Sequence, residues 1–91
     1  MSYQLIYTNS YVKKAKKFFK KHPELIKQYQ KTLELLEINP NHPSLRLHKL
    51  QGRLSELSSV PINMSYRITL EMVIQDHQIV LIVIGNHDQV Y

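Results

Sequence analysis

The sequence predicts an α+β domain, in which a two-helix hairpin packs on a mostly antiparallel four-stranded sheet in the order β-α-α-β-β-β. Three observations support this. A short alternating segment opens the chain, two amphipathic helical segments follow, and three strand-like runs occupy the second half. Ninety-one residues, 43% of them hydrophobic, are enough for one modest core. Residues 1–91 are therefore expected to form a single domain.

The first strand and the first helix follow directly from the opening residues. Residues 3–7 alternate aromatic and aliphatic side chains, as a short strand does. Thr8-Asn9-Ser10 offers side chains that accept hydrogen bonds from the free N–H groups of a first helical turn. Between Tyr11 and Phe19 the apolar residues fall at helical spacing, with lysines between them. This helix should end near His22, because a proline disfavours a helical residue before it.

A second helix is expected to begin at Pro23, where the missing N–H of proline costs nothing. Its apolar stripe runs from Leu25 to Leu36 and extends towards Ile38. The proline-rich segment 39–43 ends it. Since few residues join the two helices, they should pair as a hairpin.

Three strand-like runs follow, at about 54–59, 62–71 and 78–84. The first does not alternate cleanly. The second does, as one face of a half-buried strand would, through Ile62, Met64, Tyr66, Ile68 and Leu70. The third is a continuous run rich in β-branched residues, which indicates a central strand covered on both faces.

Positive charge is concentrated in the first part of the chain. The formal net charge is +5, and the residues up to Lys31 include eight lysines against one acid, Glu24. Such a basic segment indicates an anionic partner, either nucleic acid or an acidic protein, although a solvated helix surface is the simpler explanation. There is no cysteine, no signal-peptide-like start and no apolar run long enough to span a bilayer. A cytoplasmic protein without a membrane partner is expected.

Several familiar kinds of site are missing from the sequence. It contains no phosphate-binding glycine loop and no G-x-S-x-G motif. The five histidines lack the spacing of a zinc site. No metal and no small-molecule cofactor are therefore predicted.

Three segments carry residues suited to chemistry. In residues 45–53, Arg46 and His48 alternate with leucines, although an ordinary connecting segment would look the same. Arg67 lies on the polar side of its strand, where it could hold a phosphate or pair with an acid such as Glu56. The terminal segment 85–91 offers a histidine and a tyrosine, although a polar terminus is often only a frayed end.

These segments together resemble the RelE/YafQ branch of toxin–antitoxin ribonucleases. The resemblance lies in His48-Lys49-Leu50-Gln51-Gly52, then Tyr66-Arg67-Ile68, then Ile84-Gly85-Asn86-His87-Asp88-Gln89-Val90-Tyr91. It covers nearly the whole chain, and its terminal motif is the most specific part. It implies a RelE-like fold and a toxin that cuts messenger RNA on the ribosome without a metal. An acidic antitoxin protein is the implied partner.

The resemblance also implies roles for single residues. His48 and His87 resemble the acid–base histidines, Arg67 the arginine that steadies the scissile phosphate, and Tyr91 the terminal aromatic that contacts the substrate. RNA cleavage by the neighbouring 2′-hydroxyl needs such a base, acid and cation. RNA phosphates are expected to contact the basic residues Lys13, Lys16, Lys17, Lys20, Arg46, Lys49 and Arg53.

Two positions depart from the pattern of this branch. Many relatives carry histidine or arginine at the place of Pro61, and several carry aspartate at the place of Ser65. These departures keep a binding-only alternative open: a gyrase-poisoning fold-mate of the ParE type, or a catalytically weakened relative. A general basic RNA-binding domain is the third possibility.

Overall fold

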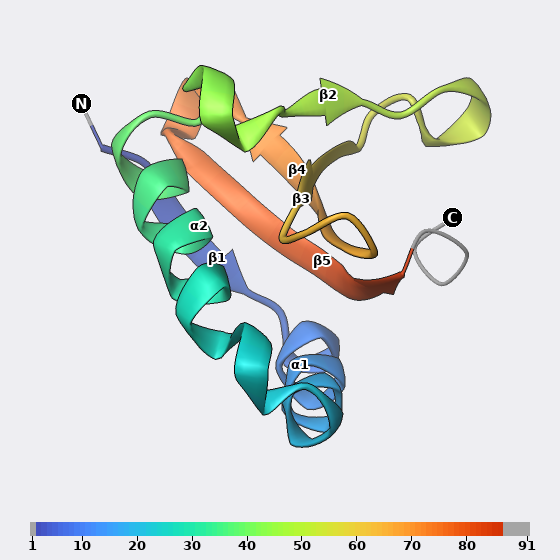
Figure 1. The fold of residues 1–91 in the computed structure, drawn as a ribbon. Helices are drawn as coiled ribbons and strands as arrows, with labels where there is room; N and C mark the ends of the chain where they lie inside the picture. The colour runs from blue at the N-terminus through green and yellow to red at the C-terminus, as the bar shows by residue number, and fades with distance from the viewer. Residues whose placement is uncertain (1, 87–91) are drawn as a thin grey trace.

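The computed structural model describes residues 2–86, and Figure 1 shows how its elements are arranged. Short 3₁₀ turns occupy Pro23–Leu25, Pro43–Leu45, Gly52–Leu54 and Ile74–Asp76. The helices and strands are β1 (Gln4–Tyr7), α1 (Asn9–Lys21), α2 (Ile26–Ile38), β2 (His48–Lys49), β3 (Ser58–Pro61), β4 (Tyr66–Val73) and β5 (Gln78–Asn86). Among the described residues, no helix is long and apolar enough to cross a membrane.

The strands form one mixed sheet in the order β1-β5-β4-β3-β2. Only the β1–β5 pair is parallel; the other pairs of the described sheet are antiparallel. The α+β class and the element order are thus confirmed, but the sheet has five strands rather than four. The additional strand, β2, pairs only His48 with Ser59 and Lys49 with Ser58, so it is too short to show a periodic pattern.

Helix α1 begins and ends where the local sequence predicts, whereas α2 begins at Ile26 rather than at Pro23, because residues 23–25 form a 3₁₀ turn. Thr8 is the N-cap of α1, and its Oγ1 accepts a hydrogen bond from the N–H of Tyr11 at 3.2 Å. The same hydroxyl donates to the carbonyl of Leu81 in β5, which ties the helix to the sheet. His22 caps the C-terminus of α1, and Pro23 opens the short turn that leads into α2.

The core lies between the helix hairpin and one face of the sheet (Figure 1). Tyr11 and Phe18 of α1 and Leu36 of α2 are buried there. They pack with buried aliphatic side chains of the sheet, namely Leu5, Val60, Ile68, Leu70, Ile79, Leu81 and Ile84. The predicted apolar stripes thus face the sheet, except at their ends, where Ile26 and Ile38 are exposed.

The predicted strand bounds were wrong in the middle of the chain. Residues 52–54 form a 3₁₀ turn, which Gly52 opens with a positive φ of 70° that glycine adopts readily, and the strand begins only at Ser58. The next strand begins at Tyr66 rather than at residue 62, because residues 62–65 turn the chain from β3 into β4. Met64 lies in that turn and is 100% exposed, so it does not belong to a half-buried strand face.

The β5 strand is interior, as predicted, but only one of its faces is fully buried and the other is partly buried. Thr69 pairs with Val83 and Leu70 with Leu81, so Ile82 is an extra residue, a β-bulge. The bulge shifts the alternation and brings the buried residues to Ile79, Leu81 and Ile84, whereas Val80, Ile82 and Val83 are only partly buried. Because the bulge changes which side chains face the core partway along the strand, apolar residues occupy both alternating sets of positions. A strand covered on both faces has the same sequence pattern.

Two tyrosines connect the helices inside the core. The hydroxyls of Tyr11 and Tyr29 lie 2.8 Å apart. Burial raises the pKa of Tyr11 far above its ordinary value, and it raises the pKa of Tyr29 as well. Both phenols therefore stay neutral in the folded protein at pH values where exposed tyrosines ionise.

We expect the free energy of unfolding to fall as the pH rises above about 10, since the unfolded chain then loses tyrosine protons that the folded chain retains. Tyr11→Phe should lower stability near neutral pH by about 0.5–1.5 kcal/mol through loss of the hydrogen bond. The free energy of unfolding of this variant should also fall less steeply above about pH 10 than that of the wild type, because one buried tyrosine is missing. Urea unfolding between pH 7 and 11 measures both effects, and equal slopes for the two proteins would contradict the burial argument.

Candidate active site

A hollow of about 780 Å³ lies where α2, the Pro43–Leu45 turn, β2 and the turn between β3 and β4 come together. His48 and Arg67 both line it, and so do Lys31, Arg46 and Pro61. We call it the His48–Arg67 hollow. It contains three cationic side chains and no acid among its described lining residues. Its electrostatics therefore favour an anion.

The sheet register explains why two residues far apart in the sequence reach one hollow. His48 pairs with Ser59, which pairs in turn with Thr69, so these three side chains form a row across the sheet. Pro61 pairs with Arg67 in the next row. Because side chains alternate along a strand, both rows lie on the face opposite to Val60 and Ile68, which are fully buried in the core.

His48 is held in one tautomer. Its Nδ1 lies 3.1 Å from the backbone carbonyl of Arg46, and a carbonyl only accepts, so Nδ1 carries the hydrogen. In the neutral ring Nε2 is then unprotonated and accepts a proton. Arg46 provides this carbonyl from a left-handed backbone conformation (φ 52°, ψ 39°), which is uncommon for a residue other than glycine.

Arg67 is placed near the start of β4, between Pro61 on β3 and Gly85 on β5. Gly85, which is buried, contributes no side chain to this row. The Nε atom of Arg67 is buried. A guanidinium held in this way retains its planar donor fork, the geometry that suits a phosphate.

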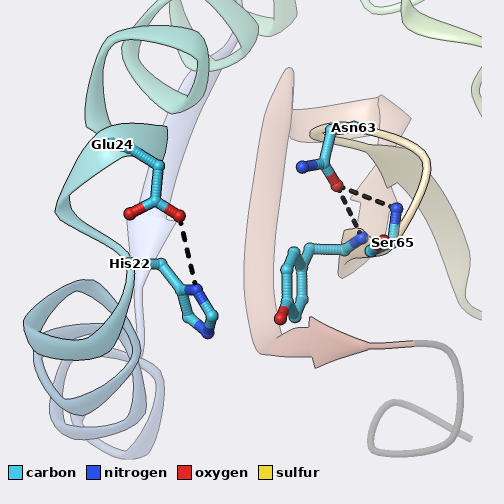
Figure 2. A network of polar contacts seen from close by, with 5 residues as sticks. His22, Glu24, Asn63 and Ser65 are labelled. Carbon is cyan, nitrogen blue, oxygen red and sulfur yellow. Dashed lines mark hydrogen bonds and ion pairs between the residues drawn. The ribbon is translucent and has the colours of Figure 1, made fainter.

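The turn before β4 is fixed by a side chain that the sequence interpretation did not single out. Asn63 Oδ1 accepts hydrogen bonds from the N–H groups of Ser65 and Tyr66, each at 2.9 Å (Figure 2). This Asx-type turn sets the residue at which β4 begins, and hence the face on which Arg67 lies. Asn63 and Lys31 also line the His48–Arg67 hollow. An asparagine two residues after a proline was a detectable turn feature, whereas nothing in the spacing of Lys31 indicated its position.

The other predicted residues do not all gather at this hollow. Arg46 lines it, but Lys13, Lys49 and Arg53 are exposed elsewhere. Lys17 and Lys20 line a separate hollow beside Tyr66, and Lys16 and Lys20 border an apolar groove on the helix hairpin. His87 and Tyr91 lie outside the described residues. In the part of the chain that is described, no group of three or more histidines or acids is arranged to hold a metal ion.

Comparison with known proteins gives matches in structure and none in sequence. No protein-family model matches the chain. No curated protein matches it either. Three similar solved structures are YafQ from E. coli strain BL21(DE3), the E. coli DinJ-YafQ toxin-antitoxin complex, and a YoeB/ParE toxin from Agrobacterium tumefaciens.

The likeness extends over nearly the full length. For YafQ the TM-score is 0.79 at 14% identity, covering 98% of each chain. For the DinJ-YafQ complex it is 0.79 at 16% identity, covering 100% of this chain and 99% of the other. For the YoeB/ParE toxin the TM-score is 0.73 at 14% identity, covering 92% of this chain and 98% of the toxin. The resemblance seen in the sequence motifs is therefore confirmed at the level of architecture: the chain has the fold of the RelE/YafQ toxins.

Proposed function

We propose that this chain is the toxin of a toxin–antitoxin pair, a cytoplasmic, metal-independent endoribonuclease that cuts messenger RNA on the ribosome. The observation that carries the proposal is that His48 and Arg67, assigned from separate motifs, line one cationic hollow on a RelE/YafQ fold. Both residue types are those that 2′-hydroxyl cleavage requires.

In the proposed reaction His48 is the base. With Nδ1 donating to the Arg46 carbonyl, Nε2 takes the proton of the 2′-hydroxyl as that oxygen attacks the adjacent phosphorus. The P–O bond to the 5′-oxygen breaks, and the products are a 2′,3′-cyclic phosphate and a 5′-hydroxyl. DNA lacks the 2′-hydroxyl and should be inert.

Arg67 stabilises the negative charge that develops on the phosphate, with Lys31 and Arg46 strengthening the field of the hollow. His87 is proposed as the acid that protonates the leaving 5′-oxygen, and Tyr91 as the group that orients the substrate. The described chain is consistent with this at its last residues, because Gly85 pairs with Arg67 and Asn86 with Tyr66. In the sequence, His87 comes directly after Asn86, the partner of Tyr66, and two residues after Gly85, the partner of Arg67.

An antitoxin is the proposed protein partner, and one surface suits it. An apolar groove of about 500 Å³ runs over the helix hairpin, with Tyr11, Ala15 and Phe19 among its lining residues and Lys16 and Lys20 beside it. A segment that combines apolar and acidic side chains complements both features. The solved DinJ-YafQ complex shows that a protein of this fold assembles with an antitoxin.

A binding-only function is the second candidate, and Pro61 favours it. Pro61 lines the His48–Arg67 hollow at the position where many family relatives carry histidine or arginine. A proline offers neither a proton nor a charge. The chain would then be a gyrase-poisoning toxin of the ParE type or a weakened nuclease.

His48→Gln and Arg67→Gln should each lower the cleavage rate by about 10²–10⁴-fold, because each removes a proton-transfer or charge-stabilising group. Mapping mRNA ends on ribosomes after induced expression measures the effect. His77→Asn is the matched control, since His77 lies in the turn between β4 and β5, away from the hollow, and Asn tolerates its positive φ of 53°. Growth arrest with intact mRNA and broken DNA would instead support the gyrase-poisoning candidate.

Pro61→His should raise the cleavage rate, by about tenfold or more, because it adds an imidazole opposite Arg67 on the same sheet face. The control is Met64→His, which adds an imidazole from the fully exposed turn residue of the same hollow. Single-turnover cleavage on purified ribosomes compares the two. No gain from Pro61→His would show that the missing group at this position does not limit the rate.

Ala15→Glu should weaken antitoxin binding at least about tenfold, since it places a negative charge in the groove proposed for an acidic segment. Ala15→Lys, of similar length but opposite charge, should weaken it less. Titration calorimetry with the cognate antitoxin distinguishes the two variants. Equal losses would mean that bulk alone matters and that the groove does not select acidic side chains.

A further inference from the structure

A second hollow, of about 730 Å³, lies between α1 and the adjoining ends of β4 and β5. We call it the lysine hollow because four lysines line it. There is no acid among its described lining residues, and its lysines are Lys14, Lys17, Lys20 and Lys21. The hollow therefore concentrates positive charge in a concave site rather than on an open helix surface.

Three aromatic rings line the same hollow. Phe18, His22 and Tyr66 contact one another, with ring centroids 4.7 Å apart for Phe18–His22, 5.0 Å for Phe18–Tyr66 and 4.7 Å for His22–Tyr66. Phe18 is buried, but His22 and Tyr66 are only partly buried. Two ring surfaces thus remain accessible beside the lysines.

His22 is oriented by the carboxylate of Glu24, 3.5 Å from its Nδ1 (Figure 2). Glu24 is itself 66% exposed, so it holds the ring from the solvent side and does not line the hollow. This contact leaves Nε2 as the second polar position of the ring. The imidazole is therefore fixed at the end of α1, against Tyr66.

The lysines of α1 are divided between two faces of the helix. Lys14, Lys17 and Lys21 follow the spacing of one helical face and line the lysine hollow. Lys13 and Lys16 lie outside that hollow, and Lys16 borders the apolar groove. The sequence analysis grouped Lys13, Lys16, Lys17 and Lys20 as RNA-contacting residues, but Lys17 and Lys20 line this hollow whereas Lys13 and Lys16 do not.

We propose that the lysine hollow binds a segment of single-stranded RNA, with a base against His22 and Tyr66 and its flanking phosphates on the lysines. Aromatic rings beside cations are the usual means of binding single strands, because each base offers a planar surface that stacks on a ring while its phosphate contacts a cation. This proposal extends the proposed function to a second site, and it depends on that function only for the choice of RNA as the ligand. Tyr66 and Arg67 are successive residues of β4, so their side chains extend from opposite faces of one strand end.

Photocrosslinking tests the stacking directly. The probe is a 2′-O-methyl RNA of about ten nucleotides carrying one 5-iodouracil, which binds without being cleaved. We expect crosslinks on His22 or Tyr66, mapped by mass spectrometry, and the same crosslinks with Arg67→Gln. Crosslinks confined to residues 43–61, or none, would overturn the proposal. Because the probe cannot be cut, this result is independent of whether the chain is a nuclease.

Matched lysine pairs test the charge. The double variant Lys14→Gln with Lys17→Gln should weaken binding of the same probe about tenfold. It should also reduce the slope of the logarithm of the binding constant against the logarithm of salt concentration by about 1.4, the contribution of two single-strand phosphate contacts. Lys13→Gln with Lys16→Gln removes the same charge at the same spacing outside the hollow and should have a smaller effect. Equal losses would show diffuse attraction along the helix and overturn the proposal. Unchanged RNA affinity with loss of antitoxin binding in the first pair would also overturn it, and would assign the hollow to the protein partner.

Discussion

The pairing of β4 with its two neighbours is the constraint on which both hollows depend. Ile68 and Leu70 are fully buried on the helix side of the sheet, and their burial stabilises the fold by about 1.5–3 kcal/mol each. A shift of one residue would expose them and turn every side chain of β4 to the other face. Hydrophobic burial of Ile68 therefore fixes the direction in which Arg67 extends.

The same constraint separates two tasks. Tyr66 lies with Phe18 and His22 on the helix side, where the lysines of α1 are close. Arg67 lies in the row of Pro61 on the other face, next to the row of His48. In the proposed mechanism, Tyr66 contacts the RNA and its neighbour Arg67 acts on the scissile phosphate. Asn63 determines where this strand begins and so links the turn to both faces.

Much of the fold was predictable, because its strongest features are local. The helix hairpin followed from apolar spacing and from Pro23, although α2 itself begins three residues later, at Ile26. The strand bounds were less predictable, since Ser58 and Ser59 are polar but buried and Met64 is apolar but exposed. The bulge at Ile82 and the two-residue strand at His48 depend on pairing between distant segments, which periodicity does not reveal.

The candidate site was predictable only in part. Family motifs pointed to His48 and Arg67, but their approach depends on the register of three strands. Lys31 reaches the hollow from α2, and the lysines of α1 divide between two faces, which charge counting could not show. His87 and Tyr91 lie outside the described residues, so their roles stay predictions.

A crystal structure of the chain with a short RNA carrying a 2′-deoxy group at the scissile position tests the central claim most directly. The account predicts a phosphate oxygen about 2.7–3.0 Å from the Arg67 guanidinium. It also predicts His48 Nε2 facing the carbon that would carry the 2′-hydroxyl. A scissile phosphate bound away from the His48–Arg67 hollow, with His48 turned from the ribose, would contradict it.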